Sequence, residues 1–257
     1  MVSSAAGVTL LLLLAPQLAA AVPTTARDSG ADDEPLMLSP LIDAGRIDEA
    51  LARSRVTKPT TGEPMGEAGF LTTTPGKHMF YWYFEAQSGD ADAPLVVWLQ
   101  GGPGGSSLFG LFSEMGPYAL TEQLELVKRN STWNKEYAMI FIDNPIGAGF
   151  SFTDDPTNGF CKDTKTCVAE NLYSLLSQFY TMHEHLQQNK LFITGESYGG
   201  HYVPGISSYI VRQNQKIRAT GGGGLVLPLA GIAVGDGWID PIRQIDAVSS
   251  QAICRCL

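Results

Sequence analysis

A short motif at residues 195–199, with the sequence GESYG, has the residue types and spacing of a hydrolytic nucleophile. Its serine, Ser197, follows an apolar run at 190–194 and starts a helical pattern at 197–213. A serine held in such a strand-turn-helix bend needs glycines on both sides, because the strained turn brings neighbouring backbone close together. The pattern predicts that Ser197 attacks a carbonyl carbon in acyl transfer. The alternative is an ordinary glycine-rich turn.

A second glycine-rich segment, WLQGGPGGSS at 98–107, comes directly after another apolar run. Backbone N–H groups in such a loop can point at the negative oxygen that develops when a nucleophile attacks a carbonyl. The simpler interpretation is a surface loop without chemistry. Two such loops after two buried strands, each with the groups that the other needs, favour an acyl-transfer site.

Both loops must be positioned by a sheet, and the rest of the sequence predicts one. Four continuous apolar runs are typical of parallel strands that are buried on both faces: 94–100, 138–143, 190–194 and 227–234. An aromatic-rich run at 79–86 predicts a further strand. Helical patterns fall at 41–53, 164–186 and 197–213. Strands that alternate with helices predict an α/β fold.

The composition is that of a folded globular protein, with 44% hydrophobic and 17% charged residues. The 257 residues suffice for one large α/β domain, although two small domains would also fit. Twenty-six acidic and 17 basic residues give a net charge of −9, with no dense Lys/Arg tract. This balance argues against a nucleic-acid partner and favours a soluble acidic surface.

The N-terminal residues have the features of a secretory signal peptide. An apolar run at 7–21 ends in small residues, which predicts a signal over 1–21 with cleavage near Ala21. A membrane anchor is the alternative, but the run is short for a spanning helix and Pro16 interrupts it. A polar segment at 22–34 follows. We expect a protein of the secretory pathway, extracellular or lysosomal, with no membrane span after signal cleavage.

Two further features fit the secretory route. Asn130 begins an Asn-Ser-Thr glycosylation sequon. Among the four cysteines, Cys161 and Cys167 are spaced to close a small disulfide loop in an oxidising compartment. Cys254 and Cys256 are too close together for an unstrained mutual bridge. The spacing of the two pairs and the lack of supporting histidines argue against zinc, so no metal site is expected.

Four longer segments carry a resemblance to the serine carboxypeptidase family, and more narrowly to the vitellogenic-like carboxypeptidases. They are WLQGGPGGSSLFGLFSEMGPY at 98–118, FIDNPIGAGFSFTDD at 141–155, GESYGGHYVP at 195–204 and GIAVGDGWIDP at 231–241. The resemblance extends over 35–248 and implies the N-terminal portion of an α/β-hydrolase domain, with a mostly parallel central sheet and flanking helices. The tail at 249–257 does not resemble the continuation of the family.

The resemblance implies a serine-type carboxypeptidase that releases single residues from the C-termini of peptides or proteins through an acyl-enzyme, without a cofactor. Ser197 matches the nucleophile. The oxyanion-binding N–H groups would be those of Gly102 and Tyr198, and the substrate carboxylate would be bound by Gln100, Gly101, Glu114 and Glu196. Many members of the family have Asn where this chain has Gln100, which keeps an amide donor.

Glu114 and Glu196 have a physical reason to act as a pair. Two carboxylates held close together cannot both ionise cheaply, so one pKa rises and a proton is shared between them. A shared proton can bind the carboxylate of a substrate, and such a site should work best in acid. The alternative for each residue is a solvated place on the surface.

The base that Ser197 needs is the part that the sequence does not supply. In this fold the acid and then the histidine follow the nucleophile. The one later histidine, His201, lies about one helical turn from Ser197 and is interpreted as a packing residue. The remaining histidines precede Ser197 and the later aspartates come too early for the acid: His78, His183, His185, Asp236, Asp240 and Asp246. We therefore expect a C-terminally truncated chain that is inactive.

Two other functions stay open from the sequence. One is a non-catalytic secreted fragment that binds peptide termini or serves as a storage product. The other is a lipase or esterase with the same elbow, against which Glu196 and the segment at 98–107 argue. The sequence gives no indication of the oligomeric state.

Overall fold

The computed structural model describes residues 34–58 and 61–247. The chain divides into Met1–Glu34 and Pro35–Leu257, and the described elements of secondary structure all lie in the second unit. The predicted signal peptide, all but the last residue of the polar segment, the tail at 249–257, and both Cys254 and Cys256 lie outside the described residues.

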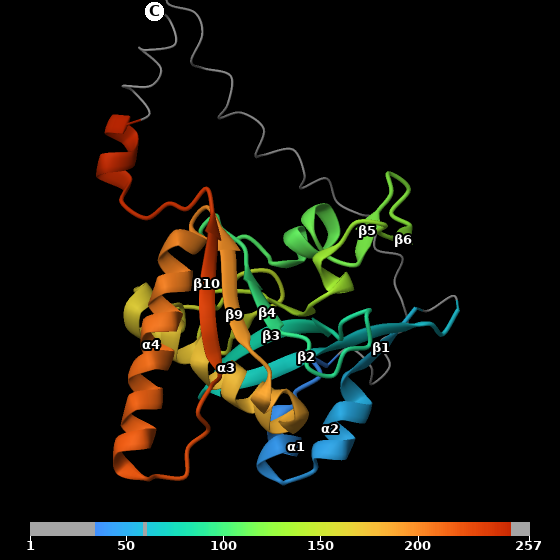
Figure 1. Cartoon of the computed structure of the whole chain (residues 1–257), viewed down its shortest axis with the longest axis horizontal. Coiled ribbons are helices and arrows are strands. Elements are labelled where there is room, and N and C mark those ends of the chain that lie inside the picture. Colours follow the sequence, from blue (N-terminus) through green and yellow to red (C-terminus); the bar gives the residue numbers. More distant parts are fainter. Residues whose placement is uncertain (1–33, 59–60, 248–257) are drawn as a thin grey trace, which may run out of the picture. The chain divides into compact units, whose positions relative to one another are not determined.

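An eight-stranded mixed sheet forms the centre of the second unit (Figure 1). Its order is β1-β2-β3-β7-β4-β9-β10, with β8 paired to β3. The strands are β1 (Arg55–Thr57), β2 (Pro64–Thr74), β3 (Lys77–Phe84), β4 (Leu95–Leu99), β7 (Ala138–Ile142), β8 (Phe152–Thr153), β9 (Leu191–Glu196) and β10 (Leu229–Gly235). Strands β7, β4, β9 and β10 run parallel, whereas the β1, β2, β3 and β8 pairings are antiparallel.

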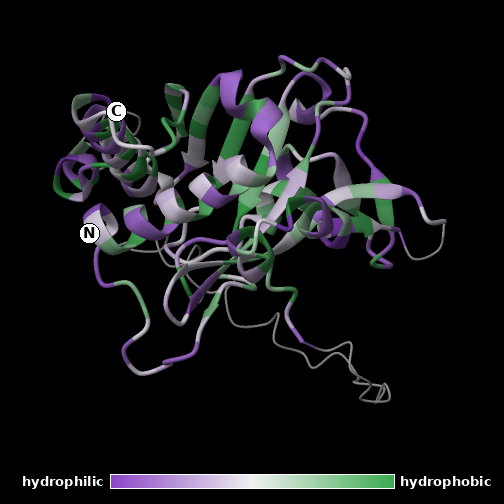
Figure 2. Cartoon of the chain, turned by 90° about the horizontal axis from the view of Figure 1, so that it is seen from below, coloured by the Kyte–Doolittle hydropathy of each residue, from purple (hydrophilic) through white to green (hydrophobic). Residues whose placement is uncertain are grey.

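Helices cover one face of this sheet. They are α1 (Ser39–Asp43), α2 (Ile47–Ser54), α3 (Ala169–Met182) and α4 (Gly199–Thr220). Helix α3 packs on β2 and on α4, which in turn packs on β9 and β10. In Figure 2 the hydrophobic colouring concentrates on the strands, while the helices alternate between hydrophobic and hydrophilic positions, as amphipathic elements do.

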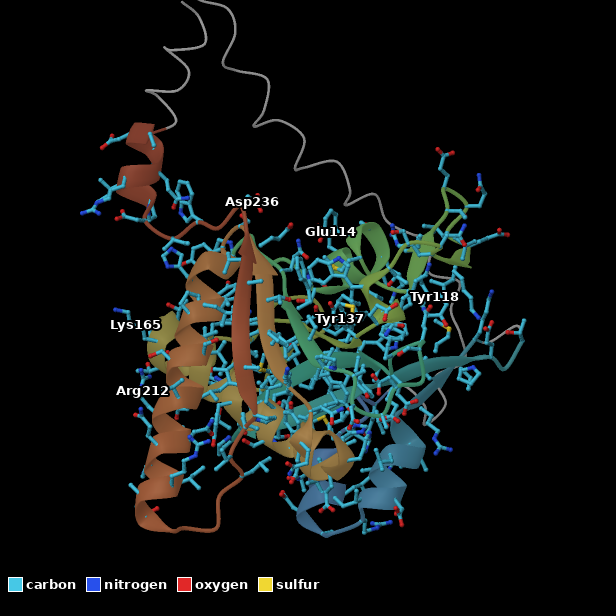
Figure 3. The ribbon with its side chains drawn as sticks, viewed as in Figure 1. Glu114, Tyr118, Tyr137, Lys165, Arg212 and Asp236 are labelled. Carbon is cyan, nitrogen blue, oxygen red and sulfur yellow. A yellow bond between two sulfur atoms is a disulfide. The ribbon has the colours of Figure 1, made fainter. Side chains whose placement is uncertain are left out.

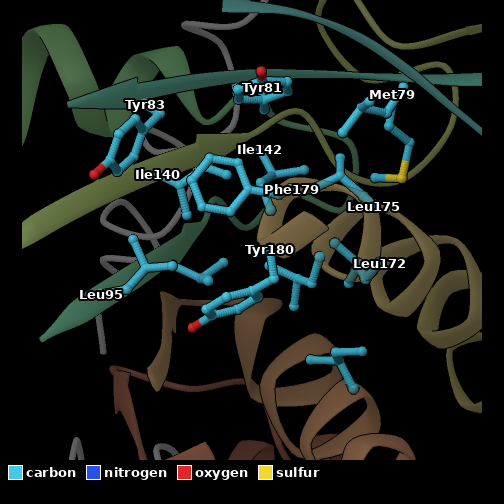
Figure 4. Close-up of a cluster of buried hydrophobic side chains, with 14 of the residues drawn as sticks. Met79, Tyr81, Tyr83, Leu95, Ile140, Ile142, Leu172, Leu175, Phe179 and Tyr180 are labelled. Carbon is cyan, nitrogen blue, oxygen red and sulfur yellow. The ribbon is translucent and has the colours of Figure 1, made fainter. Parts of the chain in front are cut away.

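The core under the helices is built around Phe179 of α3 (Figure 4). Its ring lies 5.7 Å from the ring of Tyr81 and 5.0 Å from that of Tyr83, both on β3. Every residue of β4 and β7 is buried. Burial of each large apolar side chain is worth about 1.5–3 kcal/mol, so these two strands fix the sheet from which the site is built.

A second, smaller core fills the opposite face. There Trp98 of β4 and Phe141 of β7 pack with residues of the π-helical turn η1 (Gly110–Glu114). The β5 (Tyr118–Leu120) and β6 (Leu126–Lys128) hairpin adjoins this core. The short turns η2 (Trp133–Lys135), η3 (Thr164–Val168) and η4 (Glu184–Gln188) complete the described elements that carry labels.

The predicted α/β fold is confirmed, with differences in detail. The helix predicted at 41–53 is two helices, α1 and α2. The helix predicted at 164–186 is a π-helical turn, η3, that continues directly into α3, followed by the separate turn η4. The break between α3 and η4 falls at His183, which leaves helical geometry with φ −115° and ψ 62°. Helix α4 runs past the predicted end to Thr220, where Gly221 caps it with φ +59°. Strand β2 has no counterpart in the prediction.

Candidate active site

Ser197 occupies the turn between the end of β9 and the start of α4. Its φ is +50°, in the left-handed region that a residue with a side chain seldom adopts. Three backbone hydrogen bonds hold it there: its N–H donates to Gly235 O at 3.0 Å, and its carbonyl accepts from Trp238 N–H at 2.6 Å and from Gly200 N–H at 2.9 Å. The predicted strand, turn and helix are therefore present, and the serine is in a strained conformation typical of nucleophile elbows.

The glycine-rich loop after β4 lies directly against this turn. Leu99 of β4 pairs in register with Gly195 of β9, so the ends of the two strands meet. A Cβ atom at Gly101 would lie 2.7 Å from Ser197 Cβ and 3.0 Å from Tyr198 N. A side chain at position 101 would therefore push the loop off the turn, and only glycine permits the approach.

The two amides predicted for an oxyanion hole come from the two sides of this contact. Tyr198 N lies against Gly101, and Gly102 follows in an exposed turn with φ +118°. Within the described residues, neither amide N–H donates a hydrogen bond to a protein group. Two N–H groups without partners beside a strained serine can stabilise an oxyanion.

Ser107 ties the glycine-rich loop to the neighbouring strand. Its hydroxyl donates to Ile142 O of β7 at 2.5 Å and accepts a hydrogen bond from Gln100 N at 3.1 Å. The loop is thus fixed at both the β4 side and the β7 side. This contact holds Gln100 at the carboxyl end of the sheet.

Asp143 is a buried hub that sequence reasoning missed. Its carboxylate accepts hydrogen bonds from Ser106 Oγ at 2.6 Å, Ser107 N at 2.9 Å and Phe150 N at 2.8 Å. Burial raises the pKa of Asp143, while these three donors oppose the rise by stabilising the charged form. The available signal was its position, since it is the last residue of the buried strand predicted at 138–143, at the edge of the sheet that carries the site.

Gln100 links the elbow to the second core. Its amide Nε2 donates to Glu196 Oε1 at 2.6 Å, and its Oε1 accepts a hydrogen bond from Trp98 Nε1 at 2.9 Å. Gln100 and Trp98 are both buried. The Trp98 contact fixes which end of the amide faces Glu196, so Gln100 presents its donor end to that carboxylate.

Glu114 completes the predicted carboxylate site from the last residue of η1. Its Oε2 is buried with no hydrogen-bond partner among the described residues. Burial raises the pKa of Glu114, and the nearby Glu196 carboxylate raises it further, as does Asp236 more weakly; the Gln100 amide partly offsets them. The structure thus brings Gln100, Glu114 and Glu196 together beside Ser197, with the Glu196 carboxylate close enough to raise the pKa of Glu114.

The four histidines of the described segments are engaged elsewhere. His78 lies 3.0 Å from Thr72 Oγ1 and 3.3 Å from Asp154 Oδ2. His183 Nε2 lies 3.2 Å from Glu67 Oε2, with His185 next to it. The ring of His201 packs at a tilt against that of Tyr198, with ring centres 4.7 Å apart. In residues 34–58 and 61–247, no histidine forms a hydrogen bond with Ser197.

The remaining predicted residues lie away from the elbow. Cys161 and Cys167 form a disulfide. The Asn130 side chain is exposed, in the loop that follows β6. Over the described part of the chain, no group of three or more His, Cys, Asp or Glu side chains is arranged to hold a metal ion. In that part, none of the helices combines the length and the hydropathy needed to cross a bilayer.

Comparison with known proteins gives one consistent family. A family model described as serine carboxypeptidase matches residues 59–255. The human "Probable serine carboxypeptidase CPVL" is 44% identical over 215 residues, covering 82% of this chain and 43% of the relative. The "Vitellogenic carboxypeptidase" of Aedes aegypti is 39% identical over 223 residues, covering 86% and 45%. The chain therefore spans less than half the length of these relatives.

A solved structure agrees with the sequence matches. The crystal structure of KEX1(delta)p, a prohormone-processing carboxypeptidase from Saccharomyces cerevisiae, superimposes with a TM-score of 0.60 and 26% identity, covering 68% of this chain and 39% of that one. The family model alone covers more than half of the chain, and the relatives and the structure point to the same group. This chain belongs to the serine carboxypeptidase family.

Proposed function

We propose that this site takes the C-terminal residue of a peptide, with Ser197 as the nucleophile. The observation that carries the proposal is the group formed by Gln100, Glu114 and Glu196, which adjoins the elbow. Gln100 bonds Glu196 at 2.6 Å, and the buried Oε2 of Glu114 has no partner among the described residues. A carboxyl group that keeps its proton can donate to the free carboxylate of a substrate, which peptide bonds inside a chain do not have.

The chemistry follows from the position of Ser197. Its Oγ would bond to the carbonyl carbon of the last peptide bond, and the oxygen that becomes negative would be bound by the amides of Gly102 and Tyr198. The C–N bond then breaks, the last residue leaves as an amine, and water hydrolyses the resulting ester. The hydroxyl proton of Ser197 must pass to a base and then to the leaving amine.

The acid group favours a peptidase over a lipase or esterase. A lipase would place its acyl chain or alcohol where Glu114 and Glu196 lie, and burying carboxyl groups against apolar substrate is costly. Two close acids with an amide between them instead fit a ligand that carries a carboxylate.

A second candidate function, peptide binding without turnover, follows from the positions of the histidines. Within the described residues none of them reaches Ser197, so these residues supply an oxyanion site and a carboxylate site without a base. We infer that they bind peptide C-termini by themselves with little or no turnover. Without the base, the rate enhancement falls to roughly 10³–10⁴ over water, which the oxyanion hole and substrate binding supply.

Labelling with a fluorophosphonate separates the two candidates. The chain and its Ser197→Ala variant are treated with the probe and digested for mass spectrometry, while peptide binding is measured on the same samples. Phosphonylation of Ser197, absent in the variant, supports the carboxypeptidase. Peptide binding without labelling supports the binding candidate. A folded chain that shows neither contradicts both.

We also propose that the chain enters the secretory pathway. Support comes from the signal-like residues 7–21, the Cys161–Cys167 disulfide and the exposed sequon at Asn130. One relative is named "Venom serine carboxypeptidase" of Apis mellifera, 41% identical over 214 residues. Expression in animal cells tests this proposal. We expect a glycosidase-sensitive mass increase that Asn130→Gln removes, and an unglycosylated chain confined to the cytosol would contradict it.

A further inference from the structure

The segment that follows β10 is fastened to the nucleophile elbow. Gly235, the last residue of β10, pairs in register with Glu196 of β9 and accepts a hydrogen bond from Ser197 N–H at 3.0 Å. Three residues later, Trp238 N–H donates to the Ser197 carbonyl at 2.6 Å. The turn over 235–238 is therefore clamped to both sides of the strained serine.

Asp236 sits inside this clamp. Its φ is +36°, a left-handed conformation that Asp and Asn tolerate better than most residues. Figure 3 shows Asp236 at the same end of the sheet as Glu114, although the two come from opposite sides of β9. The hydrogen bonds of Gly235 and Trp238 fix the backbone of Asp236 beside the end of β9, where Gly235 pairs with Glu196.

The charges around the pair are negative on balance. Glu196 from β9 and Asp236 from the turn after β10 both act on Glu114, while Gln100 at the end of β4 is neutral. Arg129 packs against η1, where its guanidinium donates to the Phe112 carbonyl. None of the ion pairs within the described residues involves Glu114, Glu196 or Asp236. The third acid therefore adds like charge that no direct salt bridge neutralises.

We propose that Asp236 is a positioning residue of the carboxylate site: from its clamped turn, its negative charge holds the shared proton on the Glu114–Glu196 pair, and thereby extends recognition of a free peptide carboxylate toward higher pH. This inference rests on the proposed function. A like charge disfavours ionisation of the pair, because it raises the cost of a further negative charge nearby. Asp236 acts through the pair and need not touch the substrate.

The test measures the protonation of Glu114 directly by NMR. The full chain is prepared with ¹³C-labelled glutamate, and the carboxyl carbon of Glu114, assigned with Glu114→Gln, is titrated by NMR. We expect Asp236→Asn to move the Glu114 midpoint to lower pH and Asp236→Glu, which restores the charge, to return it toward the wild type. Asp240→Asn is the matched control, because Asp240 lies on the same segment but pairs with Arg243 at 3.4 Å.

Peptide binding supplies the second reading. At a pH just above the wild-type midpoint, Asp236→Asn should weaken binding of a peptide with a free C-terminus by roughly two- to fivefold, the effect of a partly screened charge. A midpoint that stays with the Asp240→Asn control, in a chain that still binds such peptides, overturns this inference alone. A shifted midpoint in a chain that binds no peptide carboxylate overturns the proposed function instead.

Discussion

Two acidic sites lie at the carboxyl end of the same sheet, and their surroundings differ. Asp143, after β7, is almost fully buried and accepts three hydrogen bonds, from Ser106 Oγ, Ser107 N and Phe150 N. Glu114, in η1, is partly exposed, yet its Oε2 is buried with no hydrogen-bond partner in the described part of the chain, and the Glu196 carboxylate lies nearby. Burial raises the pKa of both carboxyl groups.

The difference separates a structural acid from a chemical one. At Asp143 the neighbours are donors, which stabilise the carboxylate and use it to join two loops. At Glu114 the strongest influence after burial is the carboxylate of Glu196, which raises the pKa of Glu114 further. The hydrogen-bond donors around Asp143 indicate a structural role for its carboxylate. The like charge beside Glu114 is what the proposed carboxylate-binding site requires.

Replacing the structural acid should have the largest effect. Asp143→Ala leaves the donors Ser106, Ser107 and Phe150 without their acceptor and opens a cavity, so we expect a loss of about 3–5 kcal/mol in unfolding free energy. Urea denaturation followed by circular dichroism measures it. Asp92→Ala, in an exposed turn, is the control and should cost less than about 0.5 kcal/mol. If Asp143→Ala lowers the unfolding free energy by less than about 1 kcal/mol, Asp143 does not hold the two loops together.

The second-largest effect should come from disturbing the contact between Gly101 and the turn at Ser197. In Gly101→Ala the new methyl carbon lies 2.7 Å from Ser197 Cβ and 2.9 Å from Glu196 O. The elbow or the loop must move, at a cost of about 1–3 kcal/mol in stability and with roughly tenfold weaker peptide binding. Urea denaturation measures the change in stability, and calorimetry measures the change in peptide binding. Gly223→Ala, which meets nothing within 4 Å, is the control. Equal results for both variants would show that the loops need not touch.

The pH dependence of stability should give the smallest change in unfolding free energy, but the direction of that change is fully determined. Because the pKa of Glu114 is raised in the folded chain, the folded state holds this proton more tightly than the unfolded state does. Its penalty on folding is full above the folded pKa and disappears as pH falls to the ordinary value near 4.5. Glu114→Gln should thus stabilise the chain at neutral pH, by less than about 1 kcal/mol, with little effect in acid. Thermal unfolding at both pH values measures this. If Glu114→Gln stabilises the chain in acid but not at neutral pH, the pKa of Glu114 is not raised in the folded chain.

The sequence predicted the fold where burial leaves a continuous pattern. Strands β4 and β7 are buried at every residue, so their apolar runs were sufficient. Strand β2 was missed because its burial alternates and its sequence, PMGEAGFLTTT, mixes glycines and threonines among few apolar residues. The break at His183 was missed because the apolar spacing continues across it.

The site was predictable to the extent that it follows strand ends. Ser197 and the loop at Gly101 each directly follow a buried strand, and their contact follows from parallel neighbours. Glu114 came only from the family resemblance. The role of Asp143 depends on donors 36 and 37 residues earlier in the chain. Such tertiary partners leave no local pattern.

The most direct test of the carboxylate site is calorimetric binding of one peptide in two forms, with a free C-terminus and with a C-terminal amide, at acidic and neutral pH. The account predicts that the free acid binds about tenfold or more tightly than the amide in acid, that the preference fades at neutral pH, and that Glu196→Gln weakens it. Equal affinity for the two forms in acid, with wild-type chain that is folded, would contradict the assignment of Gln100, Glu114 and Glu196 to the substrate carboxylate.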